Sequence, residues 1–181
     1  QFDKAIAQGA ALLSEVAQRG VTLRMINIGG GFPSRYNRDV PPMSAYGHAI
    51  RAAMARYFPN GAPELIVEPG RCIVGDAGVI QSEVVLVAHK GGEDARRWVY
   101  LDVGKFHGLA ETMDEAIKYR LLTPHDGTAT APVVLAGPTC DSADILYEKT
   151  DYRLPKALKA GDKVLILSTG AYTTTYSSIA F

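Results

Sequence analysis

Apolar residues along the first seventy positions alternate between two spacings. Over residues 2–20 and again over 43–57 they recur every three or four positions with polar residues between them, which predicts two amphipathic helices. Short apolar runs at 23–28 and 65–67 follow these helices and stop close to glycine or proline. The resulting order of helix, strand, helix and strand is typical of a parallel α/β sheet, either doubly wound or closed into a barrel.

The pattern changes between Cys72 and Gly78. Downstream of this point, runs rich in β-branched and aromatic residues are separated by clusters of turn-forming residues. These runs predict strands over 79–88, 98–103, 133–136, 145–147 and 164–167. We therefore predict two domains, an α/β part over residues 1–75 and a mainly β part over residues 76–181.

Composition and charge narrow the class of protein. The 181 residues carry 19 Lys and Arg against 19 Asp and Glu, and this balance disfavours nucleic acid or a charged membrane surface as a partner. No apolar run approaches the roughly 20 residues that cross a bilayer, and the start shows no signal peptide. We expect a cytoplasmic globular protein and, since the chain begins without Met, a piece of a longer one.

Cysteine and histidine give no sign of a structural metal or a disulfide framework. Cys72 and Cys140 are the only cysteines, and the four histidines fall in no ligand spacing. We expect reduced thiols and no bound metal.

Three consecutive glycines, Gly29, Gly30 and Gly31, follow the first predicted strand. Without Cβ atoms, their backbone N–H groups can come close to an anion such as a phosphate. The alternative is a tight turn that binds nothing. The segment is neither a P-loop nor a dinucleotide fingerprint, because it lacks the lysine of the first and the glycine spacing of the second.

A second motif, Glu68-Pro69-Gly70-Arg71, follows the second predicted strand. A carboxylate fixed at a strand end can hold a protonated ring nitrogen, and a neighbouring arginine can bind a phosphate with two parallel hydrogen bonds. The alternative is a structural ion pair.

Two further motifs lie in the β-rich half. Cys140 and Asp141 stand together in the turn Gly137-Pro138-Thr139-Cys140-Asp141, where a thiol can donate a proton and a carboxylate can bind an ammonium group. Tyr172 follows the last predicted strand, and its phenol can donate to a phosphate oxygen. Each has an ordinary alternative, an inert buried thiol and a packed tyrosine.

Taken together and in this order, the four motifs resemble those of the fold-type III pyridoxal-phosphate-dependent decarboxylases of ornithine, lysine, diaminopimelate and arginine. The segment Gly137–Tyr147, GPTCDSADILY, is most similar to bacterial ornithine or lysine/ornithine decarboxylases. The resemblance implies an α/β fold in which the C-terminal part of an alanine-racemase-like TIM barrel precedes a mainly β domain. It also implies that pyridoxal 5′-phosphate (PLP) is the cofactor.

The resemblance assigns roles to individual residues. It implies that Glu68 pairs with the pyridine nitrogen and so supports catalysis. The other implied cofactor-binding residues, which hold the phosphate and its surroundings, are Gly29, Gly30, Gly31, Gly70, Arg71 and Tyr172.

On the substrate side, the resemblance makes Cys140 the proton donor after CO₂ leaves and Asp141 the residue that binds the distal ammonium of the substrate. The resemblance also implies a further acid between the strand end at Val103-Gly104 and the following helix, where Glu111 is preferred to Asp114. Diaminopimelate enzymes carry Cys-Glu-Ser where this chain has Cys-Asp, so Asp141 favours a side chain that ends in a cation. In this family the loop enters the partner's site, which implies a homodimer with shared active sites.

The Schiff-base lysine of the family, found in an early barrel strand, has no counterpart here. We therefore expect an internal fragment that is inactive on its own, taken from an enzyme that converts L-ornithine, or L-lysine, to putrescine or cadaverine. Diaminopimelate and arginine decarboxylases, and a non-catalytic homologue that acts as a binding partner, are the alternatives within the same fold. A simple phosphate- or nucleotide-binding α/β module would leave Glu68 and the Cys140-Asp141 motif unexplained.

Overall fold

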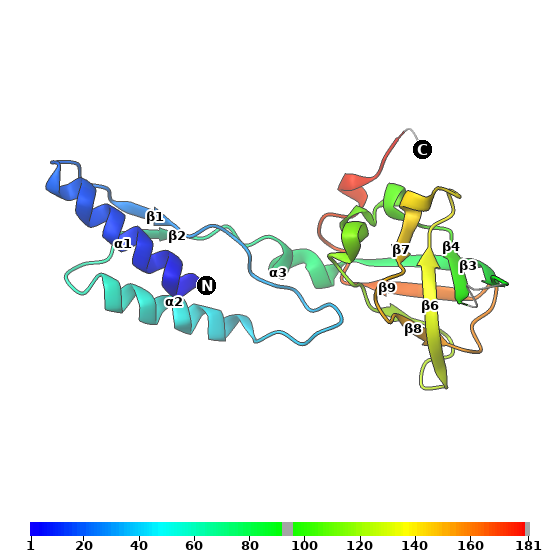
Figure 1. Cartoon of the computed structure of the whole chain (residues 1–181). Helices are drawn as coiled ribbons and strands as arrows, with labels where there is room; N and C mark the ends of the chain where they lie inside the picture. Colours follow the sequence, from blue (N-terminus) through cyan, green and yellow to red (C-terminus); the bar gives the residue numbers. More distant parts are fainter. Residues whose placement is uncertain (92–95, 180–181) are drawn as a thin grey trace. The chain divides into compact units, whose positions relative to one another are not determined.

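A computed structural model describes residues 1–91 and 96–179 of the chain. It divides into two compact units, one formed by Gln1–Pro33 with Asp39–Gly70 and the other by Ser34–Arg38 with Arg71–Phe181 (Figure 1). Within the described ranges, no helix has both the length and the apolar character required to cross a membrane.

The first unit consists of two helices and two short strands that alternate as the hydrophobic spacing predicts. Its elements are α1 (Phe2–Gln18), β1 (Met25–Asn27), α2 (Met43–Tyr57) and β2 (Glu64–Ile66). The strands pair in parallel, with Met25 opposite Glu64 and Asn27 opposite Ile66. This parallel pairing confirms the α/β character of the N-terminal part.

Packing in the first unit requires a small residue in α1. A Cβ atom on Gly9 would lie 2.5 Å from Cδ1 of Ile26, so glycine at this position lets the β1 side chain reach the helix. Ile6 of α1 and Ile26 are both buried, and α2 contributes the buried Ile50. The helices α1 and α2 lie side by side in this unit (Figure 1).

The second unit is mainly β. Its elements are α3 (Arg71–Val74), η1 (Gly75–Ala77), β3 (Val79–His89), β4 (Arg97–Leu101), η2 (Lys105–His107), η3 (Ala110–Glu115), β5 (Leu121–Leu122), β6 (Thr130–Ala136), η4 (Ser142–Asp144), β7 (Ile145–Tyr147), β8 (Arg153–Pro155), β9 (Lys163–Leu167) and η5 (Thr174–Tyr176). The strand order is β5-β9-β3-β4-β6-β7, and β8 also pairs with β6. All pairs are antiparallel except β4 with β6.

The long strand β3 makes this sheet curl. Its first half, 79–83, pairs with β9, whereas its second half, from Val84 onward, pairs with β4. The register shifts between Val84 and Leu86, as expected where a bulge bends a strand and increases its twist. The curled sheet encloses a core that includes Val84, Val99, Leu101, Leu135, Leu146, Tyr147, Val164 and Ile166.

A buried arginine ties β4 to the segment after β8. The guanidinium of Arg97 donates to the carbonyl oxygens of Pro155 at 3.0 Å and Leu158 at 2.9 Å. Burial lowers the pKa of this side chain from its usual value, since the charged form loses its hydration. The carbonyl acceptors replace that hydration and fix the first residue of β4.

Two strands were not predicted from the sequence, and both are short. β5 has two residues and β8 has three, the last being Pro155, so neither can show the alternation that marks a strand. They form because β9 and β6 offer partners that are distant in the sequence.

Glu115 anchors the connection between β7 and β8. Its buried carboxylate accepts hydrogen bonds from the backbone N–H groups of Glu148 at 2.7 Å, Lys149 at 2.6 Å and Thr150 at 2.9 Å, and from the Thr150 hydroxyl. Burial alone would raise the pKa of Glu115, but these hydrogen bonds together lower it from 4.5 to about 2. Glu115 itself has a φ of 56°, a conformation that the four bonds help to maintain.

We expect Glu115→Gln to reduce the free energy of unfolding at pH 7 by about 3 kcal/mol, which corresponds to the fall in pKa at 1.36 kcal/mol per pH unit. Because the folded pKa is depressed, the contribution is present above the unfolded pKa of 4.5 and is lost as the pH falls toward 2. Urea denaturation of both proteins between pH 7 and pH 2.5 measures this difference.

The difference in the free energy of unfolding between the unaltered protein and Glu115→Gln should therefore decrease below pH 4.5. The exposed neighbour Asp114, substituted by Asn, provides a control that removes the same charge. Stability curves that stay parallel over the whole pH range would contradict the role assigned to Glu115.

Candidate active site

The glycine turn of the first unit adopts a conformation that needs glycine at each position. Gly29 and Gly31 have φ values of 68° and 80°, which side-chain-bearing residues rarely adopt. At Gly30 the constraint is space, because a Cβ atom there would lie 2.6 Å from the carbonyl oxygen of Glu68. The turn after β1 and Glu68, two residues after the end of β2, are therefore packed backbone against backbone.

Asn27, the last residue of β1, joins these two segments. Its side-chain NH₂ donates to Oε1 of Glu68 at 2.7 Å, and its Oδ1 accepts from the N–H of Gly29 at 2.8 Å. The N–H of Glu68 in turn donates to the carbonyl of Gly29 at 2.8 Å. The Glu68 carboxylate is exposed to solvent but held in one direction, as a group that binds a ring nitrogen requires.

Asn27 is not among the site residues predicted from the sequence. A side chain with both a donor and an acceptor two residues before a glycine run is the signal that could have indicated it. The register of β1 and β2, which no local pattern reveals, places Asn27 next to Glu68.

In the second unit, Arg71 lies among three residues. Its Nη1 donates to Oε2 of Glu111 at 2.6 Å and its Nη2 donates to Oε1 of Glu111 at 2.7 Å. Nη1 also donates to the hydroxyl of Tyr36 at 2.7 Å, and the ring centroid of Tyr172 lies 4.9 Å from Cζ. Of the sequence-predicted site residues in this unit, Arg71, Glu111 and Tyr172 are thus brought together.

Electrostatics agree with this geometry. The hydrogen bonds to Glu111 raise the pKa of Arg71 above its usual value, although burial opposes the shift. Burial raises the pKa of Tyr36, so its hydroxyl stays protonated at neutral pH. The Arg71–Glu111 pair is a two-pronged ion pair, the strong and directional kind, and each side chain is 21% exposed.

The turn that carries Cys140 and Asp141 leaves both side chains exposed. Cys140 has a φ of 60°, and its Sγ lies 4.0 Å from the carbonyl oxygen of Pro138. The Asp141 carboxylate accepts from the N–H of Ala143 at 2.7 Å and so caps the short helix η4. Cys72 and Cys140 are both free thiols.

A buried carboxylate fixes the shape of this turn. Asp144, which is 1% exposed, accepts from the N–H of Lys105 at 2.7 Å and from the hydroxyl of Thr139 at 2.9 Å. A Cβ atom on Gly104 or Gly137 would come within 2.2 Å of its carboxylate oxygens. The two glycines therefore make room for the carboxylate that holds the turn in place.

Cys140 and Asp141 lie on the rim of a cavity of about 550 Å³. Trp98 and Tyr100 of β4 form one wall and stack on each other with centroids 5.9 Å apart. The ammonium of Lys90 lies 3.3 Å from the centroid of the Trp98 ring. Among the described residues, the lining of this cavity is thus largely aromatic and apolar and includes the ammonium of Lys90.

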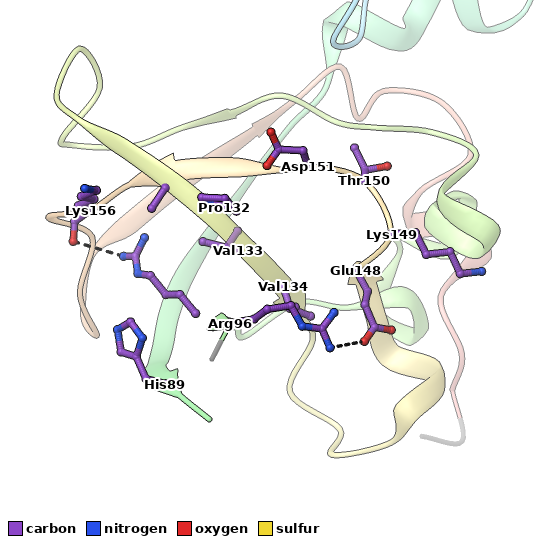
Figure 2. Close-up of a pocket in the computed structure, with 12 residues that line it drawn as sticks. His89, Arg96, Pro132, Val133, Val134, Glu148, Lys149, Thr150, Asp151 and Lys156 are labelled. Carbon is purple, nitrogen blue, oxygen red and sulfur yellow. Dashed lines mark hydrogen bonds and ion pairs between the residues drawn. The ribbon is translucent and has the colours of Figure 1, made fainter. Parts of the chain in front are cut away.

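A larger cavity of about 920 Å³ lies along β6 and contains none of the predicted site residues (Figure 2). Both arginines of its lining are already bound, since Arg96 pairs with Glu148 at 3.0 Å and Arg97 donates to backbone carbonyls. Over residues 1–91 and 96–179, no three His, Cys, Asp or Glu side chains converge as a metal site would require.

The chain matches a family model described as "Pyridoxal-dependent decarboxylase, C-terminal sheet domain" over residues 12–170. Among curated proteins, diaminopimelate decarboxylase of Staphylococcus aureus is 33% identical over 166 residues, which are 89% of this chain and 38% of that protein. Lysine/ornithine decarboxylase of Selenomonas ruminantium is 31% identical over 174 residues, 96% of this chain and 42% of that protein. The chain spans about two fifths of the length of these relatives.

A solved structure shows the same architecture. Lysine/ornithine decarboxylase from Vibrio vulnificus, crystallised with cadaverine, superposes with a TM-score of 0.79 at 34% identity, and the match covers 98% of this chain and 46% of that one.

The glycine turn yields a prediction about stability. Gly30→Ala should lower the free energy of unfolding by about 1–3 kcal/mol, the usual cost of forcing an extra carbon into a filled space, because the Cβ atom meets the Glu68 carbonyl. Gly91→Ala is the matched control, since nothing lies within 4 Å of its Cβ position and its φ is not positive. Urea denaturation followed by circular dichroism compares the two variants, and an equal loss in both would contradict the packing described here.

Proposed function

This chain belongs to the pyridoxal-dependent decarboxylases, and from that premise we propose that it is part of an enzyme that converts L-ornithine, or L-lysine, to a diamine and CO₂. The observation that carries the proposal is the exposed pair of Cys140 and Asp141 on a turn braced by the buried carboxylate of Asp144. A thiol that can give up a proton and a carboxylate that can bind an ammonium group stand side by side there.

The residues present fit the cofactor that the family uses. Each unit by itself offers groups of the kind that this cofactor requires. The first unit has the glycine turn, which allows the close approach that a phosphate needs, and the fixed acid Glu68 for the pyridine nitrogen. The second unit has the N–H groups of Arg71 that its bonds to Glu111 and Tyr36 leave for a phosphate. When bound, PLP provides an electron sink for the bond that breaks at the substrate α-carbon. The residues proposed to hold it are Gly29, Gly30, Gly31, Glu68, Gly70, Arg71 and Tyr172.

In this proposal Glu68 keeps a proton on the ring nitrogen. A carboxylate that faces the nitrogen favours the protonated ring, because the two charges attract each other at close range. The amide of Asn27 holds the carboxylate without neutralising it, so its charge stays available. Glu68 therefore supports the chemical step more than the attachment of the cofactor.

Cys140 is proposed to deliver a proton to the α-carbon after CO₂ has left, and Asp141 to bind the distal ammonium of the substrate. Asp141 keeps one oxygen on the N–H of Ala143, which fixes the direction of the other. A second substrate acid at Glu111 or Asp114 stays a prediction; Asp114 is exposed, whereas both oxygens of Glu111 bind Arg71.

Asp141 also supports the choice of substrate. An acid at this position suits a side chain that ends in a cation, as in ornithine and lysine, rather than the zwitterionic end of diaminopimelate. Ornithine and lysine differ by one methylene, which changes selectivity by only about 1–3 kcal/mol. Diaminopimelate and arginine decarboxylases remain the alternatives, and several relatives are diaminopimelate enzymes.

The proposal extends to assembly, domains and location. The exposed Cys140-Asp141 turn supports a homodimer in which each subunit contributes this turn to the active site of its partner.

The parallel β1–β2 pair leaves Met25 and Leu65 49% and 36% exposed, and parallel sheets are normally covered on both faces. This supports residues 1–75 as the C-terminal part of a larger barrel. We propose a cytoplasmic enzyme of polyamine biosynthesis that forms putrescine or cadaverine.

A substrate panel tests the proposed reaction. The intact protein that carries this chain, supplied with PLP, should release CO₂ from L-ornithine or L-lysine at least ten times faster than from meso-diaminopimelate or L-arginine. Release of CO₂ followed for each amino acid gives the ratio. Preference for diaminopimelate would overturn the substrate proposal, and no turnover despite PLP binding would favour a non-catalytic homologue.

Glu68→Gln tests the role of the carboxylate. Glutamine keeps the size of the side chain and an acceptor for Asn27 but carries no charge to hold the ring proton, so kcat should fall at least a hundredfold while the Kd for PLP changes less than threefold. Absorbance titration with PLP and CO₂ release measure the two quantities. Glu64→Gln, an exposed acid on β2, is the control, and equal losses of kcat and PLP affinity in Glu68→Gln would contradict the role.

A further inference from the structure

Three hydrogen bonds orient the guanidinium of Arg71. Glu111 accepts from both Nη1 and Nη2, and the hydroxyl of Tyr36 accepts a second bond from Nη1. An arginine has five N–H groups, so these bonds leave the Nε–H and one N–H of Nη2. The two remaining groups lie on the same edge of the planar guanidinium, which is the arrangement that binds two oxygens of one phosphate.

Tyr36 is itself held firmly. Its ring packs edge-on against Tyr119 with centroids 5.4 Å apart and an interplanar angle of 86°, and Cζ of Arg71 lies 5.8 Å from its centroid. The neighbouring Ser34 donates to the carbonyl of Arg71 at 2.7 Å, and Ser168 donates to the carbonyl of Arg35 at 2.8 Å. Residues 34–36, which belong to the second unit, are thus bound to the rest of that unit at three successive positions.

Glu111 is also held by its surroundings. It lies in η3, two residues after Leu109, whose carbonyl accepts the hydroxyl of Thr112 at 2.6 Å. The N–H of Ile117 donates to the carbonyl of Glu111 at 3.0 Å. Tyr36 is therefore placed by the packing of its ring and by the hydrogen bonds of its neighbours, and the backbone of Glu111 is placed by its hydrogen bond to Ile117.

We propose that Tyr36 and Glu111 are positioning residues that act through Arg71. They hold its guanidinium with the edge formed by Nε and Nη2 turned to the phosphate of the cofactor, and Glu111 is not a ligand of the substrate. The inference rests on the proposed binding of the PLP phosphate by Arg71. It leaves Asp114 as the remaining candidate for the second substrate acid.

A double-mutant cycle on the intact protein tests this coupling. Tyr36→Phe removes one hydrogen bond to Arg71 without a change of charge and keeps the ring on Tyr119, so the Kd for PLP should rise about fivefold. In an Arg71→Lys background the same change should have almost no effect, because the group that Tyr36 orients is gone. Tyr57→Phe, which removes a hydroxyl that donates to Asp3 in the first unit, is the matched control.

A role of Tyr36 in folding alone would appear as an equal loss of PLP affinity in both backgrounds, and that result would overturn the proposal. So would a Kd for Tyr36→Phe equal to that of the unaltered protein. If the unaltered protein bound no PLP at all, the proposed function would fail first, and this inference with it.

Glu111→Gln separates the two roles of the acid. As a positioning residue it should shift the ³¹P resonance of bound PLP and change the Kd for PLP, while the KM for the diamino acid stays within about twofold. Glu148→Gln, which removes an exposed acid paired with Arg96, is the control. A tenfold rise in KM with unchanged PLP binding would make Glu111 a substrate ligand and overturn the assignment.

Discussion

The candidate chemistry depends on one carboxylate that is held still at the end of a parallel strand pair. Asn27 ends β1, Glu68 follows β2, and the register of the two strands sets the distance between them. The absence of a side chain at Gly30 then allows the backbone of the turn to reach the Glu68 carbonyl. A carboxylate fixed in this way keeps its charge and loses only its freedom to turn, which is the property that a partner for a protonated ring nitrogen needs.

In the second unit, buried carboxylates hold two loops in place. Asp144 holds the turn of Cys140 and Asp141 by accepting backbone N–H groups, and Glu115 does the same for the β7–β8 connection. Arg71 is fixed by the reverse arrangement, a half-buried cation with acceptors on two sides. In each case hydrogen bonds satisfy the charged group and hold the surrounding backbone in place. The exposed side chains nearby are therefore carried by a fixed backbone.

The local parts of this fold could be predicted because their signals are local. The spacing of apolar residues predicts α2 with the ends that the structure has, Met43 and Tyr57, and the family resemblance is confirmed by the match over residues 12–170. The bonds that organise the site could not be predicted, since they join residues far apart. Asn27 meets Glu68 through strand register, and Tyr36 and Glu111 meet Arg71 across 35 and 40 positions of sequence. Each has an ordinary local context that gives no sign of its partner.

The protonation state of the pyridine nitrogen shows whether Glu68 acts as the partner of the cofactor ring. PLP labelled with ¹⁵N in the ring, bound to the intact protein, reports by its chemical shift whether that nitrogen carries a proton at neutral pH. We expect a protonated nitrogen in the unaltered protein and an unprotonated one when Glu68 is replaced by glutamine. An unprotonated ring beside an intact Glu68, or a shift that the substitution does not change, would contradict this role of Glu68.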